Sequence, residues 1–297
     1  MKQNNQTMPP QPTAELLRAL DSGFTERRVA VGADGAQMAY RCGGGRGPLV
    51  VLLHGISSGA ASWLPCASLL AADARVIAWD APGYGNSQAL PGAAPTAADY
   101  AQRLQALLHA LDLRPDVIVG HSLGALMAAA YIAQAGPAQL PARLLLLSPA
   151  QGYGGPGKEG KAQEVARQRL DALAALGVEG LAERGPGRLL SAAASADAQA
   201  WVRWNMRRLD PDGYRQAVAM LCGDAIDDYL GRRAPGVSVW AGCGALDVVT
   251  PPPGCAALAE RFGLPFELIP DAGHACYVEQ ARSVARWIRS GLAGYAI

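Results

Sequence analysis

Short, wholly apolar runs alternate with longer helical patterns along most of this chain, and that alternation restricts the folds open to it more than any other feature. Runs that are apolar throughout are typical of strands covered on both faces, and strands that alternate with helices form a parallel sheet. Ahead of them, two runs around the turn Ala33-Asp34-Gly35 predict an antiparallel hairpin. The expected strands are residues 25–31 and 36–41 in the hairpin, then 49–53, 75–79, 116–119, 143–147, 237–241 and 266–269.

The interval 151–233 breaks this alternation, because it holds charged, alanine- and leucine-rich helical segments and no convincing strand. We interpret it as a helical insertion that folds over the carboxyl edge of the sheet as a lid. The sequence therefore predicts an α/β fold in three parts: a first part of the core at 1–150, the lid at 151–233 and a second part of the core at 234–297. The helices expected in the core are residues 62–72, 96–111, 123–135, 255–262 and 277–293.

Composition limits the partners of the protein. Half of the 297 residues are hydrophobic, and 26 Lys and Arg against 25 Asp and Glu leave a net charge of +1. This balance offers no basic excess for phosphate or anionic lipid, so neither a nucleic acid nor a membrane partner is expected. Residues 1–12 lack the apolar stretch of a secretion signal and no later run reaches transmembrane length, which favours a cytoplasmic location. Six cysteines without CxxC spacing predict neither a metal site nor a disulfide framework.

The pentapeptide Gly120-His121-Ser122-Leu123-Gly124 follows an apolar run and opens a helix rich in small residues. This G-x-S-x-G pattern predicts a sharp strand-turn-helix elbow, which holds a serine hydroxyl out from the backbone so that it can attack a carbonyl. Ser122 is therefore the candidate nucleophile. The pentapeptide alone is also compatible with a glycine-rich loop that caps a buried helix.

A serine nucleophile needs a base, and the chain has four histidines. His109 lies in an amphipathic helix, His121 adjoins the nucleophile, and His54 ends a strand, where bracing the following loop is the more natural role. His274 lies in the loop after the last expected strand. It is the candidate base.

The base in turn needs a carboxylate to orient it. Asp247 lies in a loop that follows the expected strand 237–241, and the order Ser122, Asp247, His274 is the one that the elbow architecture uses. Asp271 is the second candidate, although a position three residues before His274 is more typical of a turn former.

Two backbone N–H groups are expected to stabilise the oxyanion that forms during acyl transfer. Leu123, directly after the nucleophile, supplies the first. Ile56, in the loop that begins His54-Gly55 after strand 49–53, presents the second.

Together these motifs resemble the α/β-hydrolase superfamily over nearly the whole chain. The resemblance rests on His54-Gly55, on Asp80-Ala81-Pro82-Gly83-Tyr84-Gly85-Asn86-Ser87, on the elbow, on Gly244-x-x-Asp247 and on Gly273-His274, in this order. It implies an eight-stranded, mostly parallel sheet with helices on both faces, a lid after the sixth strand, and a structural role for Asp80 in tying its own loop.

Within the superfamily, Ser122 distinguishes the chain from dehalogenases and epoxide hydrolases, which carry aspartate at the nucleophile position. Residues 210–217 look similar to a segment of enol-lactonases and small bacterial carboxylesterases. In the lid, Trp201, Trp204 and Arg208 fall on one helical face and Arg203 and Arg207 on another, a pattern typical of a core face beside a solvated face. If the tryptophan face instead roofs the pocket, an aromatic or hydrophobic substrate is favoured, and an arginine turned inward would select a carboxylate-bearing one. Candidates for lining the substrate pocket are Ser57, His121, Trp201, Trp204 and Cys276.

The sequence thus predicts a serine hydrolase that cleaves a small carboxylic ester or lactone through an acyl-enzyme on Ser122, with Asp247 and His274 and without metal or organic cofactor. A C–C bond hydrolase or a cofactor-free perhydrolase on the same triad is the alternative within enzymes. A non-catalytic receptor that binds a small molecule beneath the lid is a third hypothesis. Neither the substrate nor the oligomeric state is predicted.

Overall fold

The computed structural model describes residues 10–292, whose eight strands form one sheet in the order β1-β2-β4-β3-β5-β6-β7-β8. The two pairings of β2, with β1 and with β4, are antiparallel, and all the others are parallel. The expected α/β class and mostly parallel sheet are confirmed. The strands are β1 Thr25–Val31, β2 Ala36–Gly43, β3 Leu49–Leu53, β4 Arg75–Trp79, β5 Val117–His121, β6 Arg143–Leu147, β7 Ser238–Gly244 and β8 Phe266–Ile269.

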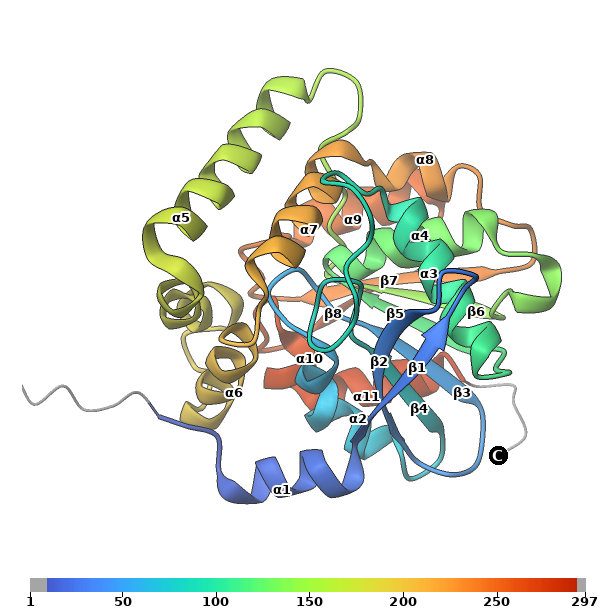
Figure 1. Ribbon diagram of the computed structural model, residues 1–297, viewed down its shortest axis with the longest axis horizontal. Helices are drawn as coiled ribbons and strands as arrows, with labels where there is room; N and C mark the ends of the chain where they lie inside the picture. Colours follow the sequence, from blue (N-terminus) through green and yellow to red (C-terminus); the bar gives the residue numbers. More distant parts are fainter. Residues whose placement is uncertain (1–9, 293–297) are drawn as a thin grey trace, which may run out of the picture.

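Helices cover both faces of the sheet (Figure 1). On one face, α3 and α8 pack against α4, which also contacts β5, while on the other face α2 and α10 pack against α11. Parallel strands need such crossover helices, and this explains why β3 and β5 are buried along their whole length and why β3 is apolar throughout. The helices are α2 Leu64–Leu70, α3 Ala97–Ala110, α4 Leu123–Gln134, α8 Ile226–Leu230, α9 Pro252–Phe262, α10 Cys276–Glu279 and α11 Ala281–Ser290.

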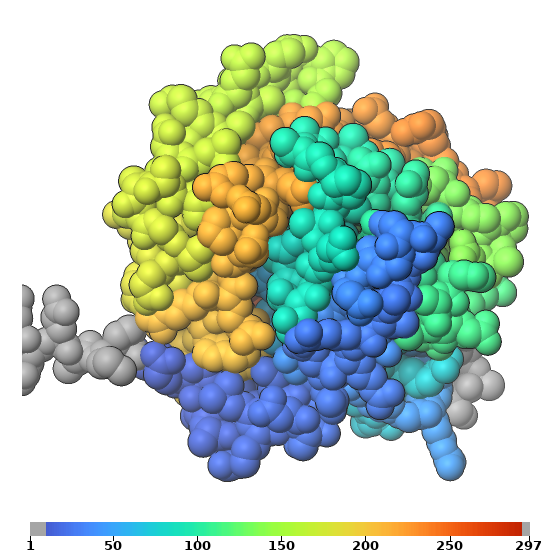
Figure 2. All heavy atoms as spheres, in the orientation of Figure 1, coloured from blue at the N-terminus to red at the C-terminus, as the bar shows by residue number. Residues whose placement is uncertain are grey.

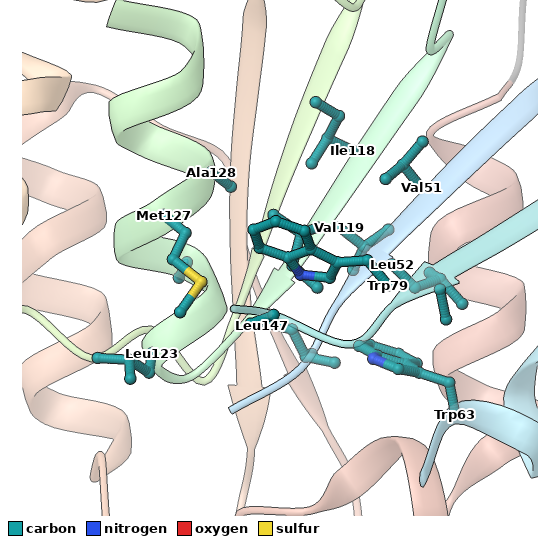
Figure 3. Packing of buried hydrophobic residues seen from close by; sticks show 14 of the residues in the cluster. Val51, Leu52, Trp63, Trp79, Ile118, Val119, Leu123, Met127, Ala128 and Leu147 are labelled. Atoms are coloured by element: carbon teal, nitrogen blue, oxygen red, sulfur yellow. The ribbon is translucent and has the colours of Figure 1, made fainter. Parts of the chain in front are cut away.

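The centre of the core lies between α4 and the middle strands. Figure 3 shows the indole rings of Trp63 and Trp79 beside strand residues such as Val119, with Met127 reaching in from α4. Both tryptophans and Val119 are fully buried. This packing places the first turn of α4, and the loop before it, against a rigid base.

A few elements differ from the expected ones. The first helix, α1 Ala14–Gly23, was not predicted, although Thr13 caps it by accepting a hydrogen bond from the Leu16 N–H. The last expected helix is two helices, because Gln280 has non-helical angles (φ −121°, ψ 50°) between α10 and α11. Its final position, Ala293, and residues 1–9 of the N-terminal segment lie outside the described residues.

Between β6 and β7 the chain forms α5 Glu159–Leu189, α6 Ala196–Met206 and α7 Pro211–Gly223 before it reaches α8. We call α5 to α7 the helical insertion. In Figure 2 it forms one flank of the molecule, coloured from yellow-green to orange. Helix α5 bends at Gly177, whose angles (φ 63°, ψ −178°) interrupt the helical path. The lid role and the three domain boundaries stay predictions.

Two further sequence predictions concern cysteines and membranes. All six cysteines are free thiols. No helix within residues 10–292 combines the length and apolar character needed to cross a bilayer.

Candidate active site

Ser122 lies in a strained turn between β5 and α4. Its φ of 51° belongs to the left-handed region that non-glycine residues rarely adopt. The turn is held from three sides: the Ser122 N–H donates to Leu147 O at 3.0 Å, and its carbonyl accepts from Ala125 N at 3.0 Å and from Ala150 N at 3.1 Å. A Cβ added to Gly124 would stand 2.5 Å from Leu53 O, so the helix can approach β3 this closely only with glycine there.

His274 and Asp247 form a buried hydrogen-bonded pair. The distance from His274 Nδ1 to Asp247 Oδ2 is 2.8 Å, and both residues are 3% exposed. The other carboxylate oxygen, Oδ1, accepts hydrogen bonds from the N–H groups of Val249 at 2.8 Å and Thr250 at 2.9 Å. Burial raises the pKa of Asp247, but the hydrogen bond and charge of His274 and the two backbone donors outweigh it, leaving a pKa of about 2. The carboxylate is therefore ionised at neutral pH.

Thr250 is part of this arrangement, and sequence reasoning missed it. Its hydroxyl lies 2.9 Å from Asp247 Oδ2, 3.2 Å from His274 Nδ1 and 3.1 Å from the carbonyl of Ser148. The signal in the sequence is a hydroxyl residue three positions after the aspartate, in a turn that the side chain of Asp247 closes.

His121 supports the loop that carries His274. Its Nε2 lies 2.9 Å from the backbone oxygen of His274, so Nε2 holds the proton that this bond requires. Burial and the neighbouring His274 lower the pKa of His121 to about 3, which keeps the ring neutral. Nδ1 has no hydrogen-bond partner among residues 10–292.

Two more buried groups fix the loop that follows β3. His54 Nε2 accepts the Ala81 N–H at 3.0 Å and its Nδ1 donates to Gly55 O at 2.8 Å, while burial lowers its pKa to about 4. Asp80 Oδ1 accepts the Ala60 N–H at 2.8 Å, and burial raises the pKa of Asp80 to about 6. His54 thus bonds within the loop that follows it, as expected, whereas the Asp80 carboxylate bonds to the Ala60 N–H after β3 and not, as the resemblance had implied, within its own loop.

A cavity of about 320 Å³ brings these parts together. Ser122 and His274 line it from the carboxyl ends of the strands, and Ile56 lines it from the loop after β3. That loop is close to the elbow, since a Cβ on Gly55 would stand 3.0 Å from Ser122 Cβ. Within residues 10–292, neither the Ile56 N–H nor the Leu123 N–H donates to a protein acceptor.

Of the other residues expected in the pocket, Ser57 and His121 line this cavity, but Trp201, Trp204 and Cys276 do not. Trp201 is buried, donates its indole N–H to Ser62 O at 3.3 Å and stacks on Trp204 with ring centroids 5.0 Å apart. The aromatic face of α6 therefore packs against the 3-10 helix Ala60–Trp63 before α2 and does not roof the pocket. Cys276 is fully buried in the core.

The lid arginines singled out in the sequence also point elsewhere. Arg203 and Arg207 form ion pairs with the acids of α5, and Arg208 lies over the ring of Trp204, 4.6 Å from its centroid. The arginines that line the cavity are Arg169, Arg184 and Arg188 of α5, which sequence reasoning did not single out.

Comparison with known proteins agrees with this architecture. The profile of the alpha/beta hydrolase family matches residues 50–287, about four fifths of the chain, so the chain belongs to that family. The match includes the loop after β3, the elbow, Asp247 and His274.

Three relatives illustrate the similarity. An uncharacterized protein of Mycobacterium tuberculosis is 39% identical over 114 residues, which cover 38% of this chain and only 32% of the relative. An esterase from Thermogutta terrifontis is 25% identical, with a TM-score of 0.77 over 90% of this chain and 97% of the esterase. The enol-lactonase of Burkholderia xenovorans is 23% identical, with a TM-score of 0.75 over 90% of this chain and 99% of that protein, and shares the fold.

Proposed function

We propose that the protein is a serine hydrolase that cleaves a small carboxylic ester or lactone through an acyl-enzyme on Ser122. The observation that carries the proposal is the 2.8 Å bond from His274 Nδ1 to the ionised Asp247, in a pair whose histidine shares a cavity wall with Ser122. The similarity to an esterase and to an enol-lactonase supports the same reaction class.

The first half of the reaction acylates the enzyme. Because Nδ1 of His274 donates to Asp247, Nε2 carries the lone pair that takes the proton of the Ser122 hydroxyl as its oxygen attacks the substrate carbonyl. The N–H groups of Ile56 and Leu123 bind the oxyanion of the tetrahedral intermediate. When the intermediate collapses, the C–O bond to the alcohol breaks, the alcohol leaves with the proton from Nε2, and the acyl group stays on Ser122.

The second half releases the acid. Water gives a proton to Nε2 of His274 and attacks the acyl carbon, and the proton returns to Ser122 as the ester bond to the enzyme breaks. Asp247 stays ionised throughout and stabilises the imidazolium. The scheme requires neither metal nor organic cofactor.

The helical insertion acts as the lid in this proposal. Its side chains, among them Leu176, Leu181, Val202 and Met206, give the cavity a largely apolar wall opposite Ser122. A small organic substrate fits such a wall, and excluding water strengthens the interactions with the oxyanion. The partner is thus a small molecule, with no nucleic acid or membrane involved.

Two measurements test the proposal. A fluorophosphonate should label Ser122 with a stoichiometry of one, and the wild-type protein should hydrolyse p-nitrophenyl esters of short acyl chains. Ser122→Ala should abolish both, with an unchanged circular dichroism spectrum. Ester hydrolysis that survives Ser122→Ala would remove the serine from the mechanism.

A further inference from the structure

Ser122 lies between two cavities. The second, of about 450 Å³, opens on the other side of the serine toward residues 149–161 and the start of α9. Ile56, Ser122 and Val249 line both cavities. A substrate whose carbonyl is attacked at Ser122 therefore has room for one arm on each side.

Basic side chains concentrate where the two cavities meet. Arg169 and Arg188 line both cavities, Arg184 lines the first, and Lys158 and Lys161 line the second. In the part of the chain from residue 10 to residue 292, no carboxylate comes within ion-pair distance of the three arginines. Lys161 is paired with Glu164 at 2.8 Å, whereas the three arginines contribute positive charge that no paired carboxylate compensates.

The acids of α5 that form ion pairs bind basic residues other than the three arginines, and Glu164 binds Lys161. Asp171 faces Arg167 on the exposed side of the helix, and Glu179 and Glu183 bind the arginines of α6. The cavity-lining arginines lie on both sides of the bend at Gly177: Arg169 precedes it, and Arg184 and Arg188 follow it. Helix α5 therefore presents its unpaired arginines to the cavities, and of its paired charges within the described residues only Lys161 also lines one of them, the second.

Arg169 and Arg188 also stand close enough to repel one another. Burial, and then the charge of Arg169, lower the pKa of the Arg188 guanidinium. The only hydrogen bond that either guanidinium makes within the described residues runs from Arg169 to the hydroxyl of Tyr214, at 3.2 Å. Two like charges in a partly enclosed site are unfavourable on their own, and a bound anion relieves them through charge-assisted hydrogen bonds.

We propose that Arg169 and Arg188 form a carboxylate-binding subsite beside Ser122, so that the preferred substrate is an ester or lactone that carries a free carboxylate on the arm away from the scissile bond. The inference rests on the proposed function for the position of the scissile carbonyl. A guanidinium matches a planar carboxylate through two parallel hydrogen bonds, which a neutral group of the same shape cannot form.

The test uses matched pairs of substrates. Monomethyl glutarate, adipate and pimelate are compared with the corresponding methyl ester carboxamides, in which CONH2 replaces COO⁻ with almost no change in shape. The readout is the ratio of kcat/KM for acid over amide, because effects common to both substrates cancel. We expect a ratio well above one for at least one chain length, falling as ionic strength rises.

Arg188→Gln should lower that ratio about 10- to 100-fold, the range for a lost charge-assisted interaction. Arg188→Lys keeps the charge but loses the forked pair of donors, so its acid-over-amide ratio should lie between those of the wild type and Arg188→Gln. Arg167→Gln is the matched control: it removes the same charge from the exposed side of α5, where both Arg167 and its partner are about 70% exposed, and should leave the ratio unchanged.

A binding measurement separates this inference from the proposed function. Ser122→Ala protein is titrated by calorimetry with monomethyl adipate and with its amide, and we expect tighter binding of the acid that Arg188→Gln abolishes. A ratio near one in both assays, or a preference that survives the Arg169→Gln/Arg188→Gln double variant, overturns the subsite. Turnover that persists without Ser122 overturns the proposed function instead and leaves the binding result to decide the subsite.

Discussion

The two walls of the cavity are built differently. On the sheet side, α4 buries ten of its 12 residues and the elbow is fixed by backbone hydrogen bonds and by the close approach of Gly124 to β3. On the insertion side, α5 buries only five of its 31 residues and is tied to α6 by ion pairs at the surface. Under the proposed function, we infer that the closely packed wall sets the chemistry and the loosely buried wall sets selectivity.

The largest expected effect lies on the closely packed wall. Asp247→Asn should lower kcat about 10⁴-fold, because an amide can no longer fix the tautomer of His274 or stabilise its charged form. Steady-state kinetics with a p-nitrophenyl ester measure the change. Asp271→Asn is the control, since Asp271 is exposed and should retain wild-type kcat. Comparable losses in the two variants would contradict the assignment of Asp247.

A pair of glycine substitutions compares the walls directly. Gly124→Ala should destabilise the protein by about 3 kcal/mol, because the new Cβ would clash with Leu53 O at 2.5 Å. Gly160→Ala in α5 meets no atom within 4 Å and should stabilise by about 0.5 kcal/mol through helix propensity. Urea unfolding measures both. Equal effects at the two positions would mean that the walls do not differ in rigidity.

The pH dependence of stability tests how firmly the loop after β3 is fixed. Burial lowers the pKa of His54 from its usual value of 6.5 to about 4. Between pH 4 and pH 6.5 this histidine is therefore protonated in the unfolded chain and neutral in the folded protein. The stability from the neutral ring is complete above pH 6.5 and is lost as the pH falls toward 4, by about 2 kcal/mol at pH 5.

His54→Gln should therefore reduce the difference between the free energies of unfolding at pH 7 and pH 5 by about 2 kcal/mol. The raised pKa of Asp80 has the opposite effect, because it favours the folded state at the lower pH. This contribution is the same in both proteins, so it cancels when the pH 7 to pH 5 difference of the wild type is subtracted from that of the variant. His109→Gln removes an exposed histidine and serves as the control. An unaltered pH dependence in His54→Gln would show that the ring takes up its proton without unfolding.

The smallest effect is expected on the insertion. Arg207 pairs with Glu179 and Glu183, whose side chains are 66% and 41% exposed. Arg207→Gln should cost less than about 1 kcal/mol, because solvent screens exposed pairs, and the cost should shrink further in 0.5 M salt. A loss of several kcal/mol would show that these ion pairs hold the insertion as firmly as backbone contacts hold the elbow.

Sequence reasoning succeeded unequally on the two walls. All eight strands were placed within three residues of their observed ends. The turn predicted the two strands of the hairpin, and continuous apolar runs predicted the other six. The role of His54 in bracing the loop after β3 could be predicted, because a residue at the end of a strand lies next to the loop that follows in the sequence. In the insertion, helical periodicity identified the face of α6 with Trp201 and Trp204 but left open whether it packs in the core or roofs the pocket, because periodicity gives a direction and not the neighbouring element. Trp201 lies in the core.

The sequence by itself determined the alternating fold and the serine at the elbow, because both depend on residues adjacent along the chain. It also singled out His274 and Asp247 through their loops at the carboxyl ends of strands. Only the tertiary structure decided the hydroxyl of Thr250 beside that pair and the choice of which arginines face the cavity. Those depend on how α5 bends and on which acids pair with which bases, and such contacts join residues far apart in sequence.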